Sequence, residues 1–224
     1  MHGICLAILL AVAGLAQAAT GAQAADAEVG ICYGYGCAHE GVARYGAAEL
    51  ANLAARLDRA RSAAAERALL GEAVGRLYRV AGRQLPVGAD RGGNYLDGGV
   101  EGRMDCIDHS TSTTRLLKLL ESRAALRFHR VLEPERRSWL IFQHFSAVIE
   151  ELTPAERIER LPPGSALARC NCTEDGMIVE GPDGAEAPSP GERYAVDSWF
   201  VDNGEPAVVL PLAEWLNGGG PNVQ

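Results

Sequence analysis

Hydrophobic residues recur with helical spacing in the first third of the chain. Between residues 46 and 82, apolar side chains fall at i, i+3, i+4 and i+7 in two successive stretches. The first stretch contains Leu50, Leu53, Ala54 and Leu57, and the second Leu70, Ala73, Val74, Leu77 and Tyr78. Ser62 stands before the second stretch, where a serine can cap a helix. We therefore predict two amphipathic helices that turn apolar faces to a core.

A different pattern follows in the second half. Residues 85–103 are punctuated by glycine and are predicted to form a long loop, and residues 107–121 are predicted to form a helix. Residues 126–132, 139–152 and 193–202 read as strands, and the middle one is apolar on both faces, as in a central strand. This order of helices followed by strands is typical of an α+β domain.

The remaining segments are connections. Residues 25–45 are rich in glycine and tyrosine and are predicted to be an ordered arm or loop. Residues 153–192 are rich in proline, glycine and charge, and they read as an insertion between two strands. The tail around residues 211–223 suggests one helical turn. With no internal repeat and no dividing linker, residues 25–224 are predicted to form a single domain with an insertion at about 153–192.

The extreme N-terminus has the pattern of an export signal. Residues 4–16 are apolar, and the small-residue motif AQA follows at 16–18 and again at 22–24. The preceding residues, MHG, carry no Lys or Arg. The alternative is a short anchor helix, but this apolar stretch is too short to span a bilayer. We predict that residues 1–24 are a signal peptide, that the protein is exported to the periplasm, and that no membrane span remains after its removal.

The net charge and the distribution of basic residues limit the kinds of molecule that the protein is expected to bind. The formal net charge is −8, and the 21 Lys and Arg residues are scattered without a basic stripe. Nucleic-acid binding needs such a positive surface and is therefore not expected.

Five cysteines lie outside the predicted signal peptide. Cys32 and Cys37 form one close couple, and Cys170 and Cys172 form another. A disulfide needs Cα atoms within about 7 Å and converging Cβ directions, which a Cys-x-Cys pair does not offer readily. We predict that the cysteines of one couple form disulfides with those of the other couple, in either of the two possible combinations. These bonds would link the N-terminal arm to the loop near residue 170. Cys106 is then left unpaired.

A metal site is the alternative for the same couples. Cys32, Cys37 and His39 together with the second couple offer enough sulfur and nitrogen ligands. Their spacing does not follow a standard zinc pattern. Cys106 stands apart in this arrangement as well.

The unpaired cysteine stands at the start of the predicted helix at 107–121, and the later strands at 139–152 and 193–202 carry His144 and Asp197. A helix N-terminus favours the thiolate, which is the reactive form of cysteine, and its free N–H groups can stabilise an oxyanion. A histidine on a neighbouring strand can accept and return the proton, and an acid on the next strand can orient the imidazole. The order predicts a Cys-His-Asp site.

Three motifs carry a family resemblance. "DCID" before a helix, "HFSAVIEE" and "YAVDSWF" resemble the bacterial transglutaminase-like cysteine proteinases of the papain and transglutaminase grouping, over roughly residues 68–203. The resemblance implies an α+β, papain/transglutaminase-like core, with N-terminal helices and a cysteine-led helix packed on an antiparallel sheet. It also implies an exported thiol hydrolase that cleaves amide bonds in a peptide or protein. Cys106 would be the nucleophile, His144 the base and acid, and Asp197 the orienting residue.

The resemblance bears on calcium as well. Members of that family carry the pattern Asp-Cys-Glu-Asp around the cysteine, and some bind calcium there. This chain keeps Asp105 and Asp108 but has Ile107 in place of the Glu. The resemblance thus implies a candidate calcium site at Asp105 and Asp108, with no other cofactor required.

Several other side chains compete for the same roles. His129 competes for the base, and His109, three residues from Cys106 on the same predicted helix, could perturb the thiol. Asp202 and Asn203 are alternative orienting groups, and Asn94 and Gln143 are candidate oxyanion donors. We rank His144 first because of its motif, and His129 second.

Two other functions remain open. One is a non-catalytic, disulfide-stapled envelope protein that binds a partner on the same fold. The other is a cell-wall peptidase of the NlpC/P60 type, whose cysteine motif usually continues with Ser-Gly, unlike "DCIDHS". A transferase, in which an amine replaces water, is chemically close to the hydrolase. The sequence makes no prediction about the substrate's identity or the oligomeric state.

Overall fold

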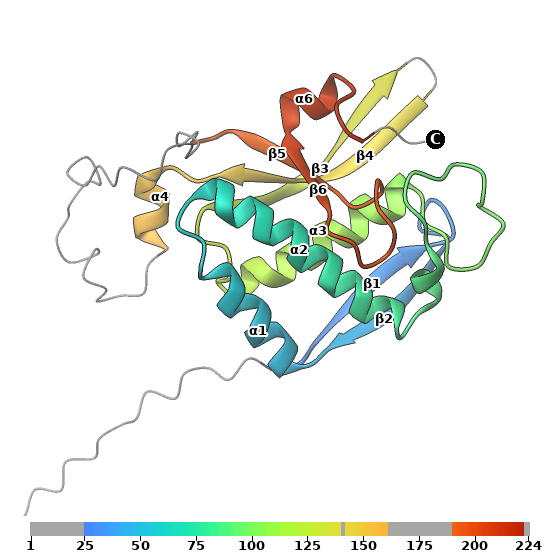
Figure 1. Cartoon of the computed structure of the whole chain (residues 1–224), viewed down its shortest axis with the longest axis horizontal. Helices are drawn as coiled ribbons and strands as arrows, with labels where there is room; N and C mark the ends of the chain where they lie inside the picture. The colour runs from blue at the N-terminus through green and yellow to red at the C-terminus, as the bar shows by residue number, and fades with distance from the viewer. Residues whose placement is uncertain (1–24, 140–141, 161–189, 222–224) are drawn as a thin grey trace, which may run out of the picture.

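The computed structural model describes residues 25–139, 142–160 and 190–221, which fold into a mixed α and β structure (Figure 1). The predicted signal peptide, Cys170, Cys172 and most of the predicted insertion lie outside these residues. None of the helices that are described has the length and apolar character needed to cross a membrane.

Two antiparallel sheets make up the strand structure. The smaller sheet pairs β1 (Ala27–Tyr33) with β2 (His39–Tyr45). The larger sheet has the order β3-β4-β5-β6. Its strands are β3 (His129–Trp139), β4 (Phe142–Glu151), β5 (Arg193–Asp197) and β6 (Val208–Pro211). The antiparallel sheet expected for the second half of the chain is present, and β4 is a central strand, as its apolar character predicted.

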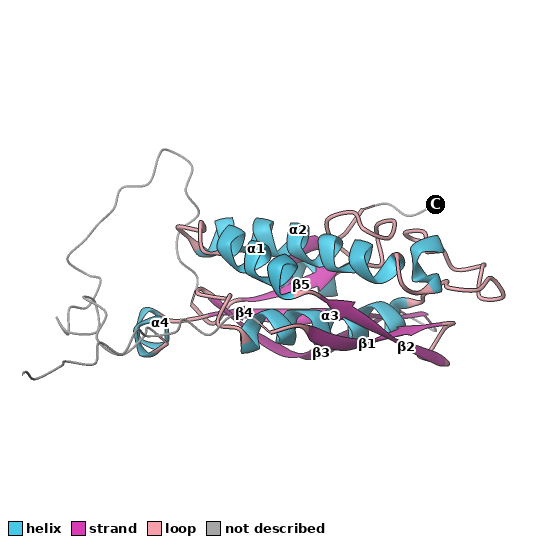
Figure 2. Cartoon of the chain, turned by 90° about the horizontal axis from the view of Figure 1, so that it is seen from below, coloured by secondary structure: helices cyan, strands magenta, loops and turns pink. Residues whose placement is uncertain are grey.

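The helices of the first half lie where the apolar spacing placed them. α1 (Ala47–Leu57) and α2 (Ala63–Gly82) fill the two predicted stretches, and they lie together on one side of the strands (Figure 2). Ser62 caps α2 by accepting a hydrogen bond from the N–H of Ala65. The glycine-rich loop that follows contains one short 3-10 helix, η1 (Pro86–Ala89).

Helix α3 (Cys106–Ser122) is the central helix of the domain and contacts both sheets. Its apolar residues join one core with α1, α2, β1 and one face of the large sheet, where Ala147 and Ile149 point. Because side chains alternate along a strand, Val148 points to the other face. There it packs with Trp215 of α6 (Leu212–Leu216). The large sheet therefore separates α3 from α6.

Strand boundaries differ from the prediction at several points. β3 starts three residues later than predicted and continues to Trp139, past a register shift between Leu132 and Glu135. Pro134 lies within this shift, since proline cannot donate a ladder hydrogen bond. β5 stops at Asp197, β6 was not predicted, and the start of the predicted insertion forms α4 (Pro154–Glu159).

The N-terminal arm was predicted as an arm or loop, but it is the hairpin β1-β2. Four successive residues in its turn, 34–37, have positive φ angles, and Tyr35 and Cys37 are not glycines. Such a turn reverses the chain in little space.

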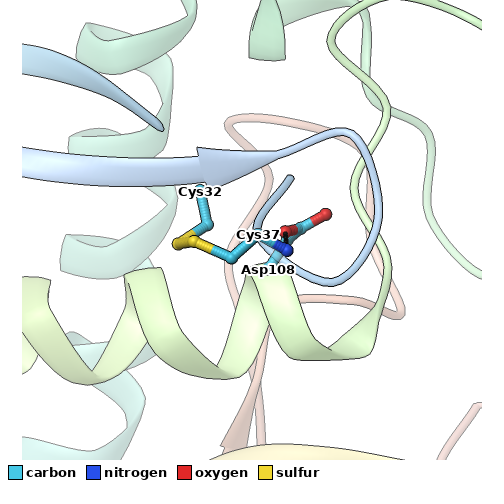
Figure 3. Close-up of side chains that lie close together, drawn as sticks. All are labelled: Cys32, Cys37 and Asp108. Atoms are coloured by element: carbon cyan, nitrogen blue, oxygen red, sulfur yellow. Dashed lines mark hydrogen bonds between the residues drawn. A yellow bond between two sulfur atoms is a disulfide. The ribbon is translucent and has the colours of Figure 1, made fainter. Parts of the chain in front are cut away.

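The disulfide in this hairpin corrects the predicted cysteine pairing. Cys32 and Cys37 are bonded to each other, with Cα atoms 4.7 Å apart (Figure 3). The prediction of cross-pairing with Cys170 and Cys172 was wrong for the first couple. The tight turn brings the two ends of CYGYGC together, whereas the argument against local pairing applied only to the shorter Cys-x-Cys. The same bond removes both thiolates from the alternative metal site.

Candidate functional site

His144 and Asp197 form a direct pair at one end of the large sheet. Nε2 of His144 lies 2.7 Å from Oδ2 of Asp197. Asp197 is the last residue of β5, and His144 lies on β4 just beyond the point where the two strands pair. Both side chains are nearly buried, with exposures of 10% and 1%. Because a buried carboxylate accepts rather than donates, this contact directs the Nε2–H to Asp197 and leaves Nδ1 with its lone pair.

Aromatic residues hold this pair in place. The His144 ring contacts the rings of Trp199, Phe200 and Trp215, with centroids 4.8 to 5.6 Å away. The indole N–H of Trp215 donates to Oδ2 of Asp197 at 2.8 Å, and the backbone N–H of Trp199 donates to Oδ1 at 3.1 Å. With three donors fixed on it, the carboxylate has little freedom to rotate.

Cys106 is the first residue of α3 and a free cysteine that is only partly exposed. Its thiol donates to the backbone carbonyl of Gln143, with Sγ 3.8 Å from the oxygen, and it also interacts with the backbone N–H of Phe145. The thiol therefore lies at the edge of β4 between the two residues that flank His144. No hydrogen bond among the described residues joins the thiol to the imidazole.

The protonation of Cys106 differs from the prediction. Burial raises the pKa of the thiol to about 11, and the carboxylates of Asp105 and Asp197 act in the same direction. The backbone N–H groups of Phe145 and Cys106 lower it, but by less. The expected effect of the helix N-terminus is thus outweighed by desolvation and nearby negative charge. Burial and the nearby carboxylates therefore favour the thiol over the thiolate.

The acids around Cys106 serve as caps. Asp105 accepts from the N–H groups of Ile107 and Asp108 through Oδ1, and from Gly36 N–H through Oδ2. Asp108 accepts from the N–H groups of Asp105 and Tyr35 through Oδ2, and from Cys37 N–H through Oδ1. Figure 3 shows the Asp108 side chain against the disulfide turn. The two carboxylates thereby join the hairpin turn to the start of α3.

These bonds bear on metal binding. Every oxygen of Asp105 and Asp108 already accepts at least one backbone N–H, whose positive end would oppose a cation. In the described ranges, one cluster has metal-ligand spacing, Cys32, Cys37 and Asp108, and both of its sulfurs are in the disulfide. A calcium ion at Asp105 and Asp108 would have to displace the capping bonds.

The same caps change the expected oxyanion site. The N–H groups of Ile107 and Asp108 are used by Asp105, so the helix start offers the N–H of Cys106 itself. The Asn94 side chain is engaged within its own loop, with Asp97 and Leu96. Gln143 lines the cavity described next, and its side-chain Oε1 accepts a hydrogen bond from the guanidinium of Arg136 at 3.5 Å.

A cavity of about 1010 Å³ opens beside the imidazole. His144 lines it together with residues 94–96, 137–138 and 142–143, and residues 216–218 at the end of α6. Tyr95 in its wall packs on Trp199, with ring centroids 4.7 Å apart. A substrate that fills this space would contact His144.

The second-ranked histidine, His129, lies elsewhere. It pairs with Glu151 in the β3-β4 register, at the far end of the sheet from His144. Its ring is fully buried, with Nδ1 2.8 Å from Glu66 and Nε2 3.5 Å from the guanidinium of Arg67. His129 therefore belongs to an interior polar cluster.

The remaining candidates are also occupied. His109 is buried between Asp90, 2.9 Å from Nε2, and Ser198, 2.8 Å from Nδ1. Asp202 accepts from the Arg91 side chain and from Gly92 N–H. Asn203 donates its backbone N–H to the carbonyl of Asp90, and its side-chain Oδ1 lies against Gly82 of α2. These groups tie the glycine-rich loop to the chain after β5 and do not contact the His144 ring.

Comparisons with known proteins add no assignment: no family model, no curated protein and no solved structure matches this chain. The family named from the three motifs therefore rests on those motifs alone.

Sequence reasoning missed Trp215 and Arg137 as site residues. Trp215 reaches Asp197 from α6, and Arg137 is opposite His144 in the β3-β4 register. Arg137 could have been found by pairing the two strands across the hairpin, because directly opposed residues lie on the same face of a sheet. Nothing in the sequence links residue 215 to residue 197.

Proposed function

We propose that the protein is an exported cysteine hydrolase that cleaves amide bonds in a peptide or protein, with Cys106, His144 and Asp197 as its reacting group. The observation that carries the proposal is the buried His144–Asp197 pair, which faces a large cavity and stands beside a free thiol. The transglutaminase-like family and the papain-like arrangement of the core are part of the same proposal.

The proposed reaction follows from the positions of the exchangeable protons on Cys106 and His144. Nδ1 of His144 takes the thiol proton as Sγ of Cys106 attacks the carbonyl carbon, forming a tetrahedral oxyanion. The C–N bond then breaks, the amine leaves with the proton from His144, and a thioester remains on Cys106. Water attacks the thioester with His144 again as base, and the acid is released with the thiol restored. Asp197 stabilises the imidazolium in both steps.

The high pKa of Cys106 defines how the thiol is activated. Burial raises this pKa most, and the carboxylates of Asp105 and Asp197 raise it further, so the surroundings of Cys106 oppose a free thiolate. A general base that takes the proton during attack avoids a free thiolate in the resting enzyme. The proposed mechanism therefore resembles that of a serine hydrolase more than that of a preformed thiolate-imidazolium pair.

Export is the second part of the proposal. The Cys32–Cys37 disulfide is typical of an oxidising compartment such as the bacterial periplasm. The signal peptide predicted at residues 1–24 supplies the route.

The test is cleavage of a complex peptide mixture. We would incubate the oxidised protein with peptides from a digested bacterial envelope fraction and identify new N-termini by mass spectrometry. New termini with the parent protein, absent with Cys106→Ala and retained with the control Ser122→Ala on the exposed end of α3, would support the hydrolase. Identical peptides with parent and Cys106→Ala would exclude it.

A second candidate is a binding protein without catalysis. The raised pKa of Cys106 favours it, because burial makes a thiol inert when no base assists it. In that case the cavity would bind a peptide that the protein does not cleave.

A further inference from the structure

Arg137 gives the cavity beside His144 a specific chemistry. It lies directly opposite His144 in the β3-β4 register, so the two side chains share one face of the sheet. Both residues line the cavity. A ligand that fills the cavity would therefore meet both Arg137 and His144.

The guanidinium is held by the backbone and by aromatic rings. Nη1 donates to the carbonyls of Trp215 and Gly219, at 2.5 and 2.8 Å. The same group stands over the ring of Trp215, 4.7 Å from its centroid, and over Phe200 at 5.9 Å. These contacts fix its position before any ligand arrives.

The other edge of the guanidinium is unused. Both hydrogens of Nη1 are taken by the two carbonyls, and within the described ranges Nε and Nη2 have no hydrogen-bond partner. Nε–H and Nη2–H point in parallel, which is the arrangement that binds a carboxylate through both oxygens.

The rest of the cavity suits an anion attached to an apolar chain. Its described lining contains no Asp or Glu, and Arg137 is its single permanent cation. Tyr95, Leu96, Phe142 and Leu216 supply a largely exposed apolar wall. Arg137 is a fixed positive charge in a protein of net charge −8, and the acid that acts on it, Asp197, is already bonded to His144 and Trp215.

We propose that Arg137 binds a carboxylate of the substrate, so that the cavity selects peptides carrying an acid close to the bond that faces His144. The inference rests on the proposed function, since it places the peptide in the same cavity. The carboxylate is either the C-terminal group of a peptide or the side chain of Asp or Glu. Arg137 is in this account a substrate-binding residue.

The test measures binding without cleavage, in the Cys106→Ala protein. Three probes share one backbone: acetyl-Ala-Leu-Ala with a free C-terminal acid, the same peptide as its C-terminal amide, and acetyl-Ala-Leu-Glu-amide. Tryptophan fluorescence reports binding, because Trp199 and Trp215 surround His144. We expect at least one of the two acids to bind about tenfold or more tightly than the neutral amide. Which acid binds more tightly identifies the source of the carboxylate.

Variants assign the effect to one side chain. Arg137→Gln should bind the acids and the amide about equally, and Arg137→Lys should keep only part of the preference because it lacks the two-pronged edge. Arg130→Gln is the control on the same strand, since its guanidinium is already paired with Glu150 and Glu156. It should keep the full preference.

Three results would overturn the inference. They are equal binding of acids and amide by the parent, no binding of any probe, and a preference that survives in folded Arg137→Gln. If Arg137→Gln does not fold, the acid-amide comparison in the parent decides alone. Because no bond is cleaved in this assay, failure of the hydrolase proposal would appear separately, as identical peptides in the cleavage experiment.

Discussion

The imidazole of His144 and the carboxylate of Asp197 lie 2.7 Å apart, although 53 positions separate them in the chain. Trp215 donates to the same carboxylate oxygen from a third element. This relationship fixes which nitrogen of His144 carries the proton, and the proposed base is therefore Nδ1.

The first prediction concerns that tautomer. In the parent protein, neutral His144 should be protonated at Nε2, as seen in long-range proton–nitrogen NMR spectra. Asp197→Ala should convert it to a mixture of tautomers, because the acceptor that selects Nε2–H is gone. Exposed His39 should show a mixture in both proteins. A neutral ring protonated at Nδ1 in the parent would contradict the arrangement.

The second prediction concerns the disulfide. Cys32→Ser combined with Cys37→Ser should lower the free energy of unfolding by about 2 kcal/mol, since the short ring no longer restricts the unfolded chain. Urea unfolding measures the change. The hydrogen bonds from the 34–37 turn to Asp105 and Asp108 should also loosen, so amide exchange at residues 35–37 should quicken. Unchanged stability and unchanged exchange would show that the turn is held without the disulfide.

The third prediction concerns the titration of Cys106. Alkylation of its thiol by iodoacetamide, followed on the Cys106 peptide, should keep rising with pH through about 10, because the pKa is raised to about 11. A plateau of fast alkylation below about pH 8 would show instead a resting thiolate-imidazolium pair.

The same shift predicts a dependence of stability on pH. The native thiol holds its proton more tightly than the unfolded one, whose pKa is about 8.5. The resulting stabilisation is complete below about pH 8.5 and is lost as pH rises towards 11. Parent protein should therefore lose more stability than Cys106→Ala between about pH 8.5 and 11, as measured by urea unfolding at each pH.

The fourth prediction concerns the buried polar cluster formed by Glu66 and His129. Glu66 and His129 are fully buried and contact each other, and Glu66 also accepts from the backbone N–H groups of Arg127 and Phe128. Glu66→Ala should destabilise the fold by about 3 kcal/mol or more, since these groups lose their partner. Glu72→Ala, exposed on the same helix, should cost less than about 1 kcal/mol. A similar small cost for both variants would contradict the role given to the cluster.

The sequence predicted elements whose signal is local. The apolar spacing of α1 and α2, the Ser62 cap and the central strand β4 all depend on residues within one segment, and each is confirmed. The β1-β2 hairpin was missed because its turn relies on positive φ angles at Tyr35 and Cys37, which are unusual for those residue types.

The candidate site was predictable in part. The motifs named His144 and Asp197, which the structure joins, and Cys106, which it places beside them. The protonation of Cys106 was not predictable, because helix position alone says nothing of burial or of Asp197 across the site. Arg137 follows from pairing β3 with β4 across their hairpin, whereas Trp215 enters the site from α6, whose position depends on the whole fold.

The most direct test of the central claim is acylation of Cys106. The folded, oxidised protein would be mixed with p-nitrophenyl acetate at about pH 7, and the acetyl thioester on the Cys106 peptide followed by rapid-quench mass spectrometry. We predict rapid thioester formation that falls about a hundredfold or more in His144→Ala and is unchanged in His39→Ala. Equal rates in the parent and His144→Ala, or no thioester until the protein is unfolded, would contradict a working Cys-His-Asp site.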